Sequence, residues 1–278
     1  MNKASFILKT KAPNMWSCLL IVLFIPVLYY GLYFTLREQR TANPQVIAHR
    51  GGRANKPENT LAAFRNSTEL GVDWLEFDVQ RTKDGVLVVI HDVTVERTTS
   101  GAGRVADLTF DELRRLDAGE GEQVPTFREV IDLAKQAEVG ILPEVKSPHL
   151  YPGIEAELLA EIEQADYLAR TGIQSFDHAI LESVLAIKPQ AQVCPLYGLW
   201  KLSLRNPQVA SAKTLCPMGE MVMLNPWMIR QAHSQGRQVY VWFGVIEHPL
   251  VMRILLAMGV DGLMVDNPAA LVKILGRP

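Results

Sequence analysis

Short apolar runs alternate with amphipathic stretches along the chain from residue 45 onward. Eight of the runs have the length and composition of buried strands, and most are separated by stretches whose apolar residues recur at helical spacing. The strands are expected at Val46–Ala48, Trp74–Val79, Ile141–Val145, Ala169–Gln174, Gln192–Leu196, Met221–Leu224, Val239–Phe243 and Gly262–Val265. Helices are expected at Thr60–Leu70, Phe127–Ala137, Ile154–Glu163, Ala179–Ile187, Pro226–Ser234 and Pro249–Met258. This alternation predicts an α/β fold, a parallel (β/α)8 TIM-type barrel.

A ninth apolar run, Val86–His91, is expected outside the barrel. The Thr-Lys-Asp-Gly stretch before it is too short for a parallel crossover, and Asp84-Gly85 is a hairpin turn signal. If those two residues form the turn, His91 lies opposite Asp78 on the preceding strand. The turn-rich residues 92–124 that follow are expected to form a small insertion with one helix, Phe110–Leu116, capped by Thr109.

The first part of the chain has a different pattern. Met15–Leu36 is a run of 22 residues without a charge, long enough for a membrane-spanning helix. A cleaved signal peptide is the alternative, but its apolar region would be shorter and would end in a small-x-small site. The sequence therefore predicts a basic flank at residues 1–14, an anchor at 15–36, a linker at 37–44 and a barrel domain at 45–278. More lysines before the run than arginines after it favour a cell-membrane protein with an extracytoplasmic domain.

Composition narrows the classes of function. Hydrophobic residues make up 48% of the chain and charged residues 21%, which fits a sizeable core. The net charge of −2, without a long basic run, argues against a nucleic-acid binder. The three cysteines, Cys18, Cys194 and Cys216, form no zinc motif, and three free thiols are expected. Only Cys194 and Cys216 could pair within the barrel domain.

Candidate catalytic groups follow the first strand and the ninth run. His49-Arg50-Gly51-Gly52 stands at the end of the first strand, where barrel active sites are built. A histidine there can act as acid or base near neutral pH, and Arg50 offers a planar fork to a phosphate. His91 provides the second imidazole, so one can accept a proton while the other donates one. The other four histidines are expected to be structural or at the surface.

Carboxylates alternate with apolar residues in two strands. Glu76 and Asp78 face the same side of one strand, and Glu144 and Lys146 share a face of the next. Burying several carboxylates together is costly unless a cation offsets their repulsion, and Ca²⁺ and Mg²⁺ prefer oxygen ligands. The pattern predicts a divalent metal held by Glu76, Asp78 and Glu144, with Lys146 on the phosphate. Two alternatives remain open: a solvent-facing acidic strand, and an internal Glu144–Lys146 pair without a ligand.

Together these motifs resemble the glycerophosphodiester phosphodiesterase family from about Val46 to Pro268. The resemblance is carried by HRGG at His49, ENTLAAF at Glu58, GVDWLEFDVQRTKDGVLVVIHD ending at Asp92, RTTSGAG at Arg97, PTF at Pro125, PEVK at Pro143, QSF at Gln174 and GVDGLMVDNP at Gly259. It implies a distorted barrel that hydrolyses glycerophosphodiesters to glycerol 3-phosphate and an alcohol. Within it, His49 and His91 match catalytic positions, and one Ca²⁺ or Mg²⁺ ion is implied at the three carboxylates.

The resemblance also assigns supporting roles and shows one departure. Arg50 and Lys146 match phosphate-contacting positions, and Glu58 with Asn59 belongs to a segment that orders the loop beside the metal. Where relatives often have Trp-Thr-Val-Asn, this chain has Trp242-Phe243-Gly244-Val245. Trp242 is expected to pack against the substrate. The more apolar mouth, together with the anchor, suggests a lysophospholipase D-type activity as an alternative.

Two further alternatives concern the chemistry. Paired histidines also suit a related barrel phospholipase in which a hydroxyl of the substrate attacks and forms a cyclic phosphate. An inactive, membrane-tethered module that only binds a phosphodiester is the alternative outside enzymes. The presence of both histidines and all three carboxylates argues against that module.

Overall fold

The structure is a computed structural model that describes residues 27–36, 43–199, 203–204 and 209–277. The chain forms two compact units, Met1–Glu38 and Gln39–Pro278. In the first unit, residues 27–36 are helical. The expected anchor, residues 15–36, lies outside the described part as far as residue 26. Within the described part, no helix combines the length and the apolar character needed to cross a membrane.

The second unit contains the predicted barrel. Eight parallel strands pair in succession, and β1 closes the ring by pairing with β9 on one side and β2 on the other. They are β1 (Gln45–Ala48), β2 (Trp74–Arg81), β4 (Gly140–Val145), β5 (Gly172–Ser175), β6 (Gln192–Tyr197), β7 (Thr214–Pro217), β8 (Gln238–Trp242) and β9 (Gly262–Val265). The prediction of a TIM-type barrel is confirmed.

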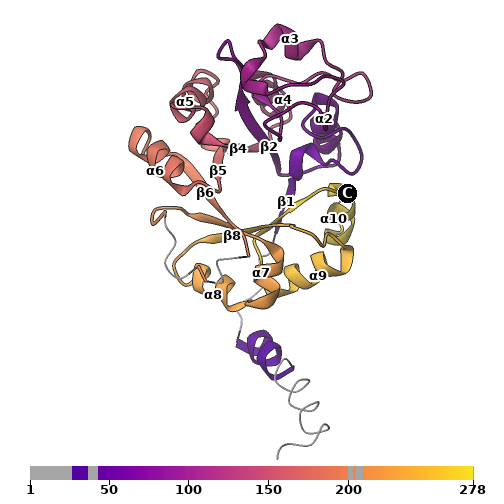
Figure 1. Cartoon of the computed structure of the whole chain (residues 1–278). Coiled ribbons are helices and arrows are strands. Elements are labelled where there is room, and N and C mark those ends of the chain that lie inside the picture. Colours follow the sequence, from indigo (N-terminus) through magenta and orange to yellow (C-terminus); the bar gives the residue numbers. More distant parts are fainter. Residues whose placement is uncertain (1–26, 37–42, 200–202, 205–208, 278) are drawn as a thin grey trace, which may run out of the picture. The chain divides into compact units, whose positions relative to one another are not determined.

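Helices surround the strands (Figure 1). They are α2 (Leu61–Glu69), α4 (Phe127–Gln136), α5 (Ile154–Gln164), α6 (His178–Ile187), α7 (Gly219–Leu224), α8 (Trp227–His233), α9 (Pro249–Met258) and α10 (Pro268–Leu275). Their ends follow local sequence signals. The Thr126 side chain accepts the Glu129 N–H, and the Glu129 side chain accepts the Thr126 N–H, which forms a capping box on α4. The helix α9 begins with proline and ends at Gly259 in the left-handed region.

Two strand predictions differ from the structure. Met221–Leu224, expected as a strand, is the end of helix α7, and the strand is β7, a few residues earlier. A short apolar run does not reveal by its periodicity whether it is helical or extended. The strand expected at Ala169–Gln174 begins later, at Gly172, because residues Leu168–Arg170 form the 3-10 turn η4.

The ninth run forms an antiparallel hairpin strand, β3 (Leu87–Val89), on the outer end of β2. Its predicted register is wrong by one residue, since Ile90 rather than His91 lies opposite Asp78 and donates its N–H to the Asp78 carbonyl. The turn has three residues because Thr82 bonds to Val86 and Gly85 adopts a φ of 87°. Three-residue hairpin loops place such a left-handed glycine last.

The insertion after the hairpin has a core of its own. It contains the short turn η2 (Val105–Asp107) and α3 (Phe110–Arg114), with Thr109 in a capping box as predicted for its cap. The helix is two residues shorter than expected. The buried side chains that it shares with the hairpin are Val88, Ile90, Val95, Val105, Leu113, Ala118 and Val124. This packing holds the hairpin and its following residues at one end of the barrel.

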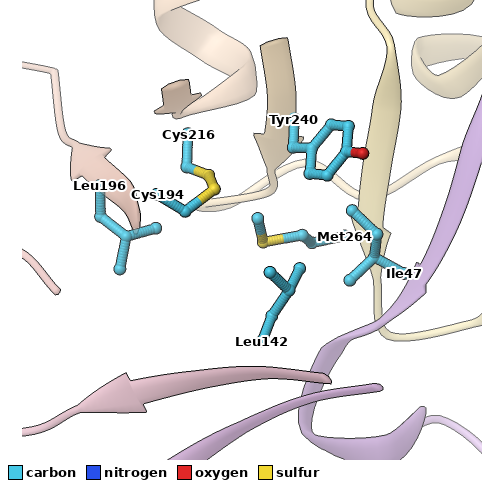
Figure 2. Close-up of a cluster of buried hydrophobic side chains, with 7 residues drawn as sticks. All are labelled: Ile47, Leu142, Cys194, Leu196, Cys216, Tyr240 and Met264. Carbon is cyan, nitrogen blue, oxygen red and sulfur yellow. A yellow bond between two sulfur atoms is a disulfide. The ribbon is translucent and has the colours of Figure 1, made fainter. Parts of the chain in front are cut away.

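The barrel interior contains a disulfide between Cys194 on β6 and Cys216 on β7, with Cα atoms 5.9 Å apart. The expectation of free thiols is therefore wrong for these two cysteines. Figure 2 shows the bond among Ile47, Leu142, Leu196, Tyr240 and Met264. Strands β6 and β7 pair through only two residue pairs, so the disulfide adds a covalent link where backbone pairing is sparse.

Removal of this disulfide should lower the free energy of unfolding by about 3 kcal/mol, because it closes a loop of 22 residues in the unfolded chain. Urea denaturation with and without reductant measures the difference. Thiol titration of the denatured protein should find one thiol before reduction and three afterwards, as the chain has three cysteines. Three thiols before reduction would contradict the pairing.

Candidate active site

A cleft opens at the carboxyl ends of the barrel strands, where the active sites of barrel enzymes lie. The residues that line it are His49, Arg50, Arg53, Glu76, His91, Glu144, Lys146, Phe176, Leu196, Trp242, Phe243, Gly244 and Met264. Seven of the ten residues predicted from the sequence are in this set. The other three, Asp78, Glu58 and Asn59, contact its members, as described below.

Of the three predicted carboxylates, Glu76 and Glu144 line this cleft and Asp78 lies against them. Glu76, Asp78 and Glu144 are buried, and each offers an oxygen within 4.8 Å of the others. The strand register explains the meeting, because Asp78 pairs with Glu144 across β2 and β4 and Glu76 faces the same side. At 2% and 1% exposure, Glu76 and Asp78 exclude the alternative of a solvent-facing acidic strand.

This group of carboxylates fits a divalent cation. Burial, together with the negative charges of Asp78 and Glu76, raises the pKa of Glu144 to about 7 despite the opposing effect of Lys146. Burial also raises the pKa of Glu76. The site therefore does not hold three negative charges without compensation, and oxygen-only donors of this kind suit Ca²⁺ or Mg²⁺.

Lys146 supplies part of that compensation. Its Nζ lies 3.0 Å from Glu144 Oε1 and 3.4 Å from Asp78 Oδ1. The internal Glu144–Lys146 pair considered from the sequence is thus present, within a larger acidic group. Because Lys146 also lines the cleft, its ammonium is placed to contact an anion that enters.

The turn after β1 brings backbone and side chain of Arg50 to the carboxylates. Arg50 has a φ of 50°, and its N–H donates to Glu76 Oε2 at 2.8 Å. Its Nε lies 3.6 Å from Asp78 Oδ2. Gly51 is required in this turn, since a Cβ there would lie 2.9 Å from the Phe64 ring. Gly51 also has a φ of 80°, in the left-handed region that non-glycine residues rarely adopt.

Glu58 and Asn59 hold the same turn from the other side. Asn59 donates its N–H to the Arg50 carbonyl at 2.9 Å and its Nδ2 to Asp78 Oδ2 at 2.9 Å. Glu58 Oε1 accepts from Arg50 Nη1 at 3.0 Å and from Arg97 Nη2 at 2.7 Å. Glu58 and Asn59 therefore connect this turn to Asp78 and Arg97.

The two histidines are each bonded to an aspartate through Nδ1. His49 Nδ1 lies 2.6 Å from Asp266 Oδ1, and its Nε2 lies 3.9 Å from Glu76 Oε2. His91 Nδ1 lies 2.5 Å from Asp92 Oδ1. Both imidazoles line the cleft, so the structure brings together the pair that the sequence placed 42 residues apart.

The surroundings act differently on the two imidazoles. Burial lowers the pKa of His49, but the charge of Glu76 and the hydrogen bond to Asp266 outweigh it, so the net shift is upward. Burial also lowers the pKa of His91, and the positive charges of Lys146 and Arg50 add to this effect and outweigh Asp78. The His49 imidazole therefore favours its protonated form more than the His91 imidazole does.

The opposite wall of the cleft is aromatic. Trp242, at the end of β8, packs edge-to-face on Phe176, which follows β5, with ring centroids 5.4 Å apart. Phe243 and Gly244 continue this wall. Beyond them, Val245 is 83% exposed and Ile246 49% exposed at the rim. The cleft thus has a charged side and an apolar side.

Sequence reasoning missed several residues of the site. Arg53 lines the cleft, and Asp266 and Asp92 bind the histidines. A signal was present for Asp266, which directly follows the strand Gly262–Val265, at the end where the other candidates stand. The rule that active-site residues follow the carboxyl ends of barrel strands, which identified His49, would also have identified Asp266. Arg97 lies in the RTTSGAG motif, and its contact with Glu58 depends on the tertiary structure.

Comparison with known proteins decides the family. Residues 49–270 match the model of the glycerophosphoryl diester phosphodiesterase family. The chain belongs to this family. A glycerophosphodiester phosphodiesterase of Caldanaerobacter subterraneus subsp. tengcongensis is 38% identical over 245 residues, which cover 84% of this chain and 98% of that protein.

Solved structures of this phosphodiesterase family also match. A glycerophosphodiester phosphodiesterase from Agrobacterium tumefaciens has a TM-score of 0.71 and 27% identity, covering 82% of this chain and 98% of that one. A phosphodiesterase from Oleispira antarctica, solved with the product sn-glycerol-3-phosphate, has a TM-score of 0.71 and 25% identity, covering 84% and 97%. Membership makes this chain a phosphoric diester hydrolase, and the resemblance seen in the motifs is confirmed.

Proposed function

We propose that this protein hydrolyses glycerophosphodiesters to glycerol 3-phosphate and an alcohol, using a divalent cation and the two histidines. The observation that carries the proposal is the meeting of Glu76, Asp78 and Glu144 with both imidazoles in one cleft. A bound Ca²⁺ or Mg²⁺ would offset negative charge on the phosphate. The complete set of catalytic side chains argues against an inactive binding module.

The side chains have complementary tasks in this reaction. Lys146 and Arg50 attract the phosphate to the charged side of the cleft. Water attacks the phosphorus while one imidazole accepts its proton, the bond from phosphorus to the departing oxygen breaks, and the other imidazole donates a proton to that oxygen. Proton acceptance and donation balance, so the two histidines end in exchanged protonation states. The aromatic wall of Trp242 and Phe176 faces the organic part of the substrate.

A lysophospholipid is the second candidate substrate. The apolar rim favours it, because Val245, Ile246 and Phe176 are exposed beside the cleft and would cover part of an acyl chain. Trp242, Phe243 and Gly244, from the segment that departs from the family pattern, line this side of the cleft. The same charged groups would bind the phosphate in either substrate.

We also propose that residues 15–36 anchor the protein in the cell membrane with the barrel outside the cytoplasm. The uncharged run supports the anchor, and the Cys194–Cys216 disulfide supports an oxidising compartment. Alkylation of cysteines with a membrane-permeant reagent before cell lysis tests the location. Alkylation of both Cys194 and Cys216 would place the barrel in a reducing compartment.

The proposed function is tested by a substrate panel. Purified protein with Ca²⁺ or Mg²⁺ should release glycerol 3-phosphate from glycerophosphocholine, and a chelator should abolish the release. Lysophosphatidylcholine in the same panel tests the lipid alternative, and a clear preference for glycerophosphocholine would eliminate it. Activity that persists in excess chelator would contradict the role of the cation. A cyclic phosphate product would indicate attack by a substrate hydroxyl instead of water.

A further inference from the structure

The hydrogen bond between His49 and Asp266 fixes more than the position of a side chain. A carboxylate only accepts hydrogen bonds, so the proton of the neutral imidazole must be on Nδ1, which lies 2.6 Å from Asp266 Oδ1. Nε2 is then left as the free acceptor on the side of Glu76, toward the cleft. That tautomer is the one a proton-transferring histidine needs.

Other residues hold both the side chain and the backbone of Asp266. Its Oδ2 lies 2.7 Å from Arg53 Nη2. Its N–H and that of Asn267 donate to the two carboxylate oxygens of Glu247 at 2.6 and 2.8 Å. His49 and Arg53 thus hold the carboxylate of Asp266, and Glu247 holds its backbone. Burial raises the pKa of Asp266, yet hydrogen bonds from His49 and Arg53 hold it well below its usual range.

The strand register explains how the two residues meet. Ala48 of β1 pairs with Val265 of β9, and His49 and Asp266 are the residues that follow each. Neighbouring parallel strands that end at the same level bring the next side chains together at the mouth. The contact is therefore built into the barrel and does not depend on a long loop.

His91 has the same type of support. Asp92 binds its Nδ1, and Arg97 Nε lies 2.5 Å from the second oxygen of Asp92. Each catalytic imidazole is thus backed by an aspartate and then an arginine. Glu58 contacts both arginines. It forms a bidentate ion pair with Arg97, and its Oε2 lies 3.9 Å from Arg53 Nη1. The recurrence of this arrangement indicates a shared task at the two imidazoles.

We propose that Asp266, backed by Arg53 and Glu247, is the positioning residue that sets the tautomer and orientation of His49. This inference rests on the proposed function, because it assigns how one of its two histidines is held. Asp266 acts through His49 and does not itself contact the substrate phosphate. The aspartate of a serine protease triad holds its histidine in a comparable way.

The chain offers a matched control at the other end of the same strand. Asp261 precedes β9, and its Oδ2 lies 2.8 Å from Nε2 of His233, at the amino end of the barrel strands. Asp261 is buried and Asp266 is partly buried, and each binds a histidine. Residues at the amino end of barrel strands support stability, whereas the carboxyl end carries the chemistry.

Asp266→Asn should lower kcat for glycerophosphocholine by about 100-fold or more, with KM changed by less than about threefold. The asparagine amide can donate to Nδ1 and favour the wrong tautomer. Asp261→Asn should leave kcat within about twofold of the original protein. Asp266→Asn added to His49→Ala should cause no further loss, because Asp266 acts only through His49.

A second measurement does not depend on activity. Proton NMR of the original protein should show a strongly deshielded Nδ1–H of His49 that is lost in Asp266→Asn, while circular dichroism shows both variants folded. A kcat within threefold of the original, an equal loss in Asp261→Asn, or additive losses in the double variant would overturn the inference. If the original protein hydrolyses no glycerophosphodiester, the proposed function fails, and the NMR signal still tests the pair.

Discussion

His49→Ala and His91→Ala should each lower kcat for a glycerophosphodiester by about 10²- to 10⁴-fold, because each removes one of the two groups proposed to transfer protons. KM should change much less, since Lys146 and Arg50 still line the cleft and attract the phosphate. The kcat of the double variant should be only slightly lower than that of the less active single variant, because the imidazoles act in one reaction. Steady-state kinetics with saturating Ca²⁺ or Mg²⁺ measures all three.

His233→Ala is the matched control for these variants. His233 is also bonded to an aspartate, Asp261, but lies at the amino end of the barrel strands. Its replacement should leave kcat unchanged while lowering stability modestly. A His49 or His91 variant that keeps its activity would refute acid–base catalysis by this pair without contradicting the fold.

Glu144→Gln should abolish the stabilisation of the protein by Ca²⁺ or Mg²⁺ and reduce activity by about 100-fold or more, while raising stability in chelator. The neutral amide removes one of three buried carboxylates that repel each other without a cation. A saturating cation stabilises the original protein by roughly 2.7 kcal/mol at 100 times its Kd. Thermal unfolding with cation and with chelator measures both effects.

The same variant should also change the pH dependence of stability. In chelator, the pKa of Glu144 is raised from 4.5 to about 7 in the folded state, so the folded protein binds more protons than the unfolded chain between these values. Stability should therefore fall as pH rises from about 4.5 to 7, and this slope should be reduced in Glu144→Gln. Gln136→Glu, at the end of the surface helix α4, serves as a control with an unrelated charge change. Lower stability of Glu144→Gln in chelator would contradict repulsion among the carboxylates.

Most of the barrel could be predicted because its strands are short apolar runs between amphipathic helices. Boundaries at α9 followed from a proline at the start and a glycine at the end. The failures occurred where local patterns are ambiguous. Met221–Leu224 has the composition of a strand, yet it forms α7, because Thr214–Pro217 already supplies the strand at that place in the ring.

The hairpin shows a different kind of failure. The sequence identified Asp84-Gly85 as a turn but did not reveal that the loop has three residues, which moved the register by one. His91 still reaches the cleft, because it follows β3 and is held by tertiary contacts. Gln80 on β2 donates its Nε2 to the carbonyls of Ile90 and His91 at 3.2 and 2.9 Å. His91 was therefore placed at the cleft despite an incorrect register.

The sequence by itself determined the family of this protein and the candidate groups of its site. The alternation of Glu76 with Asp78, the histidines at strand ends and the spacing of the motifs are local patterns, and local patterns follow from the periodicity of strands and the chemistry of side chains. Only the tertiary structure decided which other residues support these candidate groups. The pairing of Ala48 with Val265 joins His49 to Asp266 across 217 residues, and the closed ring places Cys194 beside Cys216. Such contacts depend on strand order and register, which arise only when the whole barrel closes.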